Sequence, residues 1–85
     1  MELTIENYHT QTLKRTEIVS DSNSFVTITQ RMALDGVTWE EPRMYTNRIR
    51  MMDNDGINAF KDALDMAAII FAAWSEDAGK EIAEG

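Results

Sequence analysis

Residues 25–34, FVTITQRMAL, are the stretch that decides the fold. Successive side chains of a β-strand point to opposite faces of its sheet, so alternate positions share a face. One face of this stretch is largely apolar and comprises Val26, Ile28, Met32 and Leu34, and the other comprises Thr27, Thr29, Arg31 and Ala33. Gln30 interrupts the apolar face. The pattern predicts a strand that buries one side against a core and leaves the other side open.

Shorter strands are expected on both sides of this stretch, over residues 3–8, 13–19, 37–41 and 45–51, since these segments are rich in residues that favour strands. Asp35-Gly36 is a typical hairpin dipeptide. Pro42 cannot donate to a strand ladder, so it interrupts the sheet or marks an edge. In the last strand, Tyr45, Asn47, Ile49 and Met51 would share one face, and Thr46, Arg48 and Arg50 the other.

A long helix is expected after the strands. Asp53-Asn54-Asp55 offers side chains that cap a helix N-terminus, and carboxylates suit the positive end of the helix dipole. The helix should run from about Gly56 to Glu76 and direct an apolar stripe at the sheet, formed by Ile57, Phe60, Leu64, Ala67, Ala68, Phe71 and Trp74. The expected fold class is therefore α+β: a curved antiparallel sheet of about four to five strands followed by one long C-terminal α-helix.

A second apolar stripe on the same helix predicts self-association. It lies away from the stripe that would cover the sheet and comprises Met66, Ile69, Ile70 and Ala73. A chain of 85 residues without cysteine has a thin core and no disulfide to supplement it, and association is the usual remedy. We expect a homodimer through these residues; the alternative is that the N-terminal segment folds over them.

No arrangement of residues is typical of an enzyme. His9 is the only histidine and the chain has no cysteine, whereas a zinc site needs several such ligands. The acidic pairs Glu40-Glu41 and Asp53/Asp55 lack a partner that would tune them for acid–base catalysis. The four glycines are isolated, so no phosphate-binding loop is present. We expect neither catalysis, nor a metal, nor a cofactor.

The formal charge is −7, yet the basic residues are concentrated in the middle of the chain. Residues 14–50 contain six basic and five acidic residues, whereas residues 51–85 contain two basic and eight acidic ones. An open sheet face with arginines can follow a phosphate backbone, and aromatic residues on it can stack on bases. The alternatives are a solvated surface of mixed charge and core packing of the aromatic residues. The candidate DNA-binding residues are Lys14, Arg15, Thr27, Thr29, Arg31, Trp39, Arg43, Tyr45, Arg48 and Arg50.

We do not expect the first ten residues, MELTIENYHT, to be a signal peptide. This segment has neither the basic region nor the apolar run of a signal peptide. The most apolar run, residues 63–74, is too short to span a bilayer. We expect a cytoplasmic protein, in the host cytoplasm if a phage encodes it. Residues 1–76 would form the domain and residues 77–85 a short acidic tail. Such a tail can recruit a protein partner, compete with DNA for a basic surface, or only maintain solubility.

The stretch FVTITQRMALDGVTWEEPRMYTNRIRMMDNDGINAFKDALDMA resembles the C-terminal domain of the eukaryotic transcriptional coactivator positive cofactor four and its small bacterial and phage relatives. The resemblance covers roughly residues 14–68. The shared order is an alternating strand that ends in Arg31, a hairpin, Pro42-Arg43, the short strand Ile49-Arg50-Met51, a capping turn, and a helix with Ile57, Phe60 and Leu64. Asp21-Ser22-Asn23-Ser24 departs from the family, whose first hairpin carries lysine and aromatic residues.

The resemblance implies a homodimer with two saddle-shaped sheets that binds single-stranded DNA or unwound duplex with little sequence preference. Arg31 matches the family's strand arginine, Arg43 matches its basic position after the proline, and Lys14 and Arg15 lie near its basic first strand. The leading hypothesis is a sequence-independent single-stranded DNA-binding homodimer that acts in transcription, replication or recombination. The alternatives are an acidic protein-binding inhibitor or DNA mimic of the phage type, and a purely structural subunit.

Overall fold

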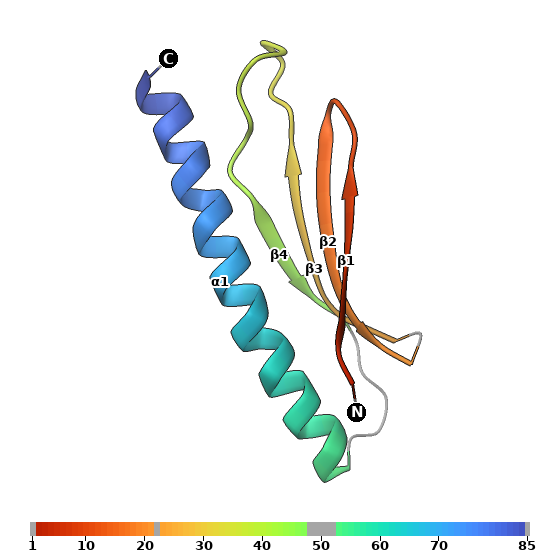
Figure 1. The fold of residues 1–85 in the computed structure, drawn as a ribbon. Helices are drawn as coiled ribbons and strands as arrows, with labels where there is room; N and C mark the ends of the chain where they lie inside the picture. The colour runs from red at the N-terminus through yellow and green to blue at the C-terminus, as the bar shows by residue number, and fades with distance from the viewer. Residues whose placement is uncertain (1, 22, 48–52, 85) are drawn as a thin grey trace.

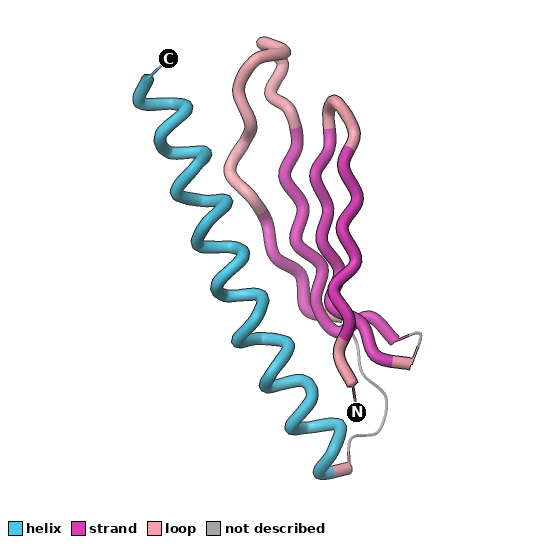
Figure 2. The backbone as a smooth tube through the Cα atoms, viewed as in Figure 1, coloured by secondary structure: helices cyan, strands magenta, loops and turns pink. Residues whose placement is uncertain are grey.

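Four strands form one antiparallel sheet, and a single long helix packs on one of its faces (Figure 1). The computed structural model describes residues 2–21, 23–47 and 53–84, with side chains through residue 78. The strands are β1 (Thr4–His9), β2 (Leu13–Ser20), β3 (Asn23–Arg31) and β4 (Arg43–Thr46), paired in sequence order, and α1 spans Asn54–Glu84. Figure 2 shows the strands as neighbours, with the helix on one side of them. The expected α+β fold is confirmed.

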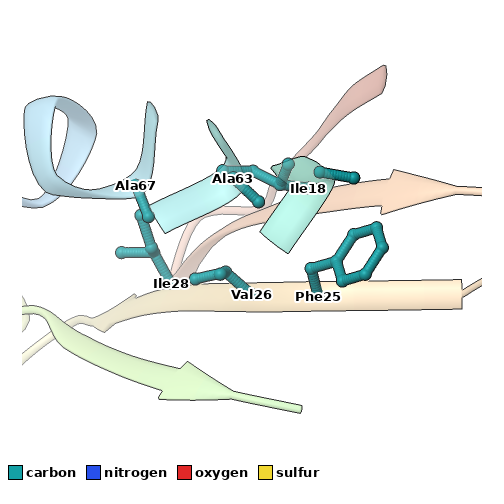
Figure 3. Packing of buried hydrophobic residues seen from close by; sticks show 7 residues of the cluster. Ile18, Phe25, Val26, Ile28, Ala63 and Ala67 are labelled. Carbon is teal, nitrogen blue, oxygen red and sulfur yellow. The ribbon is translucent and has the colours of Figure 1, made fainter. Parts of the chain in front are cut away.

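The core lies between α1 and the middle strands. Ile18, Val26 and Ile28 are fully buried, and Ala63 and Ala67 of α1 face them (Figure 3). Small alanine side chains let the helix backbone approach the sheet closely, while larger side chains close the flanks of the contact. These flanking residues, packed against the core, are Leu3, Phe60, Leu64, Met66, Ile70, Phe71 and Trp74. Full burial of each large aliphatic side chain stabilises the fold by about 1.5–3 kcal/mol.

The helix buries most of the expected stripe, with Ala67 in the core and Phe60, Leu64, Phe71 and Trp74 packed against it. Ala59, Ala63 and Ala67 form the contact line, whereas Ile57 is 51% exposed and Ala68 is also exposed. The expected second stripe is likewise divided: Met66 and Ile70 pack against the chain's own core, and Ile69 and Ala73 are exposed. Large apolar side chains dominate the periodic pattern of the helix sequence and so dominate the prediction. The positions closest to the sheet require small side chains instead. No helix in the described part of the chain is long and apolar enough to cross a membrane.

The ends of the helix follow partly from the sequence. Asp53 Oδ1 accepts a 2.8 Å hydrogen bond from Gly56 N, which confirms the expected capping role of this segment. The helix continues to Glu84 rather than ending near Glu76. Residues 77–84, expected as a separate tail, are therefore helical, and Ala78 among them is buried.

Residues 37–41 do not form the expected fifth strand. Pairing beyond β3 stops at a single bridge between Met32 and Trp39. The carboxylate of Asp35 accepts hydrogen bonds from the backbone nitrogens of Val37 and Thr38, and Gly36 adopts a positive φ of 72°. A side chain that takes these backbone donors competes with a strand ladder. Leu34, expected on the buried face, is fully exposed in the resulting turn.

The pairing of β4 with β3 decides which face of β4 lies on the helix side of the sheet, a point that the sequence pattern leaves open. Tyr45 lies opposite Thr27, away from the helix, and Thr46 lies opposite buried Val26. Asn47 fixes this register, because its Nδ2 donates to Ser24 Oγ at 2.8 Å and to Thr27 Oγ1 at 3.0 Å. A one-residue offset exchanges the two faces of a strand, so these side-chain hydrogen bonds decide which side chains of β4 reach the open side of the sheet.

Candidate nucleic-acid interface

The face of the sheet opposite α1 is the candidate interface, and we call it the open face. Its side chains alternate along the strands with the buried ones, because successive residues point to opposite sides. It comprises Glu6, Tyr8, Leu13, Arg15, Glu17, Thr27, Thr29, Arg31, Arg43 and Tyr45.

One row of the open face crosses all four strands. Tyr8 lies opposite Arg15, Arg15 opposite Thr29, and Thr29 opposite Arg43. Two arginines and a tyrosine from different strands are thereby brought onto one line, although 35 positions separate the first from the last. Such a line of cationic and aromatic side chains suits a nucleic-acid strand, whose phosphates and bases it can contact in turn.

Arg15 is held in the middle of this row by Tyr8. The guanidinium carbon of Arg15 lies 4.4 Å from the centre of the Tyr8 ring, a cation–π contact. The Tyr8 hydroxyl donates a 2.8 Å hydrogen bond to Glu6 Oε2. This bond to a carboxylate, together with the charge of Glu6, raises the pKa of the Tyr8 hydroxyl above its usual value. Tyr8 thus contacts Arg15 through its ring and Glu6 through its hydroxyl.

The charges of the open face are unevenly distributed. On the β1–β2 side, Glu6 and Glu17 lie directly opposite each other, a like-charge pair that opposes an approaching phosphate. On the β3–β4 side, Arg31 ends β3 and Arg43 begins β4. The two exposed arginines of the open face are thus both on the β3–β4 side.

A hollow of about 420 Å³ lies on that side of the open face. This volume is within the range of sites that take small ligands. It is lined by Thr29, Arg31, Glu40, Glu41, Pro42, Arg43 and Tyr45. Arg31 and Arg43 are exposed, and Tyr45 is 49% exposed, so all three side chains are accessible to a ligand.

The loop between β3 and β4 forms one wall of the hollow. Glu40 N donates to Arg31 O at 2.8 Å, and Gln30 Nε2 donates to Glu40 O at 3.0 Å. Gln30, whose place on the apolar face the sequence leaves unexplained, is buried and uses its amide to tie this loop to the sheet. Glu40 and Glu41 are site residues that the sequence reasoning missed; their position next to Pro42-Arg43 is the only signal for them.

Lys14 and Trp39 lie on the other side of the sheet. Lys14 is opposite Gln30 and so shares the face of α1, and its Nζ lies 4.3 Å from the centre of a Trp39 ring. The His9 ring is 6.1 Å from that of Trp39. These two predicted DNA-binding residues form a cation–π contact with each other and do not belong to the open face.

The remaining predicted residues divide as follows. Arg15, Thr27, Thr29, Arg31, Arg43 and Tyr45 share the open face, whereas Arg48 and Arg50 lie outside the described residues. Within residues 2–21, 23–47 and 53–84, no three histidine, cysteine or acidic side chains gather as metal ligands would.

No protein-family model, curated protein or solved structure gives a significant match to this chain. Its function is therefore inferred from the chemistry of the open face.

Proposed function

We propose that the open face binds single-stranded DNA, mainly through its phosphates, and that the chain does so as a homodimer of the positive cofactor four type. The observation that carries the proposal is the placing of Arg31, Arg43 and Tyr45 around one accessible hollow. Arginine forks onto phosphate oxygens, and tyrosine offers a ring on which a base can stack. A sheet of four strands followed by one helix is the arrangement that the family resemblance implies.

A single strand suits this site better than a duplex. Tyr45 can stack only on a base that is free of its neighbours, and bases in a duplex are already stacked and paired. The hollow of about 420 Å³ is in the size range of sites for small ligands, which suits one unstacked nucleotide better than a double helix. The phosphates of a flexible single strand can also adapt to arginines on two different strands of the sheet.

The acidic net charge is compatible with this function because the acidic residues are concentrated elsewhere. The exposed side chains Asp62, Asp65 and Asp77 belong to α1, on the opposite side of the sheet from the open face. At physiological salt, charges farther apart than about 8 Å are largely screened from each other. A phosphate at Arg43 therefore responds to nearby arginines more than to the helix.

Titration of a fluorescent oligonucleotide tests the proposal. The protein is added to labelled single-stranded DNA and to the matching duplex at low and at moderate salt, and anisotropy is recorded. We expect tighter binding of the single strand and weaker binding as salt rises, since phosphate contacts release counterions. Absence of single-strand binding even at low salt would favour the acidic inhibitor that binds a protein instead of DNA.

A further inference from the structure

The hollow on the open face carries both signs of charge. Arg31 and Arg43 line it together with Glu40 and Glu41. A surface that only follows phosphates gains nothing from carboxylates, because each of them repels the DNA backbone. Two carboxylates beside two arginines and a tyrosine suit a ligand that presents hydrogen-bond donors as well as a phosphate. A nucleotide with amino and imino groups on its base is such a ligand.

The acidic wall is fixed before any ligand arrives. Both backbone polar atoms of Glu40 are hydrogen-bonded: its N donates to Arg31 O, and its O accepts from the side-chain amide of Gln30. The Gln30 residue is only 2% exposed. Pro42, directly after Glu41, is buried and has a restricted backbone. The segment that carries the two carboxylates is thus anchored to β3 on one side and to β4 on the other. A wall anchored in this way loses little freedom on binding, and that favours selectivity.

The bases differ in how well they fit a carboxylate. Guanine presents two neighbouring donors, N1–H and the N2 amino group, which can bind both oxygens of one carboxylate. In cytosine and adenine, the amino group lies beside a ring nitrogen that accepts hydrogen bonds and repels the second oxygen. The N3–H of thymine lies between two carbonyl oxygens, which repel a carboxylate from both sides. The Watson–Crick edge of guanine is therefore the best match.

We propose that the hollow is a single-nucleotide subsite that prefers guanine, an inference that rests on the single-strand binding proposed above. Arg31 and Arg43 bind the phosphate, Tyr45 supports the base, and Glu40 or Glu41 accepts the guanine N1 and N2 hydrogens. The subsite adds a modest base preference to binding that otherwise depends on phosphates.

Affinities for four labelled single strands of about 12 nucleotides, within the usual site sizes, test this preference. The strands are oligo(dT), alternating thymine–cytosine, alternating thymine–guanine, and alternating thymine–inosine, none of which is self-complementary in Watson–Crick pairing. Inosine differs from guanine only by the missing N2 amino group. We expect the thymine–guanine strand to bind at least about fivefold more tightly than the other three, because a bidentate contact discriminates by about 1 kcal/mol or more. Equal affinity for all four would overturn the preference and leave single-strand binding intact. If the protein binds none of the four strands, both the guanine preference and the proposed single-strand binding are wrong.

The double variant Glu40→Gln with Glu41→Gln identifies the groups responsible. An amide has one acceptor oxygen, so the ratio of thymine–guanine to oligo(dT) affinity should fall to near one, while oligo(dT) binds as well as before or better. The matched control is Asp62→Asn with Asp65→Asn, which removes the same charge from exposed positions of α1. The control should keep the ratio of the native protein. If the double variant strengthens binding to all four strands equally, the carboxylates act only by repulsion, and the inference is wrong.

Discussion

The side-chain amide of Gln30 donates a 3.0 Å hydrogen bond to the carbonyl oxygen of Glu40. This bond joins the buried face of β3 to the loop that forms one wall of the hollow. A polar side chain on the apolar face of a strand is costly unless it is hydrogen-bonded. Here the bond satisfies the Gln30 Nε2 donor and also positions the candidate site, so the stability of the core and the shape of the site depend on the same residue.

Replacing Gln30 with methionine should therefore affect both the stability of the fold and the binding of DNA at the hollow. Gln30→Met keeps the length of the side chain and removes the donor, and we expect a loss of about 1 kcal/mol in the free energy of unfolding, typical of one hydrogen bond. Chemical denaturation measures this loss, and affinity for single-stranded DNA should fall with it. Gln11→Met, at an exposed bend, is the control and should change neither quantity. Native-like stability of Gln30→Met would show that the bond does not anchor the loop.

Asp35 should make the turn after β3 sensitive to acid. Hydrogen bonds from Thr38 N, Val37 N and the Thr38 hydroxyl lower the pKa of Asp35 below its ordinary value of 3.8. Since the folded value is the lower one, the turn is stabilised at pH above 3.8, and that stabilisation is lost as pH falls through the folded pKa. NMR titration of the Asp35 carboxyl carbon should give a midpoint below 3.8, shared by the Thr38 amide proton. In Asp35→Asn the Thr38 amide should not titrate. A midpoint at or above 3.8 would contradict the structure of the turn.

The parts of the fold that the sequence predicts are those set by local patterns. The alternation from Val26 to Arg31 specifies β3, and Asp53 specifies the start of α1 through its own side chain. The face of β4 is not predicted, because it depends on hydrogen bonds from Asn47 to Ser24 and Thr27, which are distant in sequence. The buried stripe of α1 is predicted in part, because Ala67 and the large residues beside it do face the core. Ala59 and Ala63 are missed, since the sheet selects small side chains at the closest contact.

The candidate site is also predicted from the sequence only where local strand alternation determines it. The alternation along β3 places Thr29 and Arg31 on the same face, and the register then brings Arg43 next to Thr29. Lys14 and Arg15 are neighbours in sequence with equivalent charge, yet strand geometry sends them to opposite faces. Only the three-dimensional register reveals that Tyr8 joins the row of Arg15.

The homodimer should depend on Ile69, which is 73% exposed in the single chain. Ile69→Asp would place an unpaired charge in the proposed subunit interface, and an uncompensated buried charge costs about 3–5 kcal/mol. We expect light scattering to show a dimer for the native protein and a monomer for the variant. Circular dichroism should remain unchanged, because the residue is exposed in the monomer. Asn58→Asp, at another exposed position of α1, is the control and should remain dimeric. A native protein that is monomeric at micromolar concentration would disprove the dimer.

The acidic end of α1 should weaken DNA binding at low salt. This end lies at the same end of the molecule as the loop of residues 32–42, which contributes to the hollow (Figure 1). Deletion of residues 77–85 would also remove buried Ala78, so Glu81→Gln with Glu84→Gln is the cleaner change. We expect this variant to bind single-stranded DNA several-fold more tightly at low salt and almost equally at high salt, where charges are screened. Asp62→Asn with Asp65→Asn, farther from that end, should have a smaller effect. Equal effects of the two variants would indicate that only net charge matters.

The salt dependence of binding by Arg43→Ala tests the central claim most directly. Arg43 is exposed and lines the hollow, so its loss should leave the fold intact and remove one phosphate contact. We predict that the slope of log affinity against log salt for single-stranded DNA becomes shallower by about 0.7, the value for one phosphate neutralised on a single strand. Lys61→Ala, which removes an exposed cation from α1, should keep the slope of the native protein. Identical slopes for the native protein, Arg43→Ala and Lys61→Ala would contradict binding at the open face.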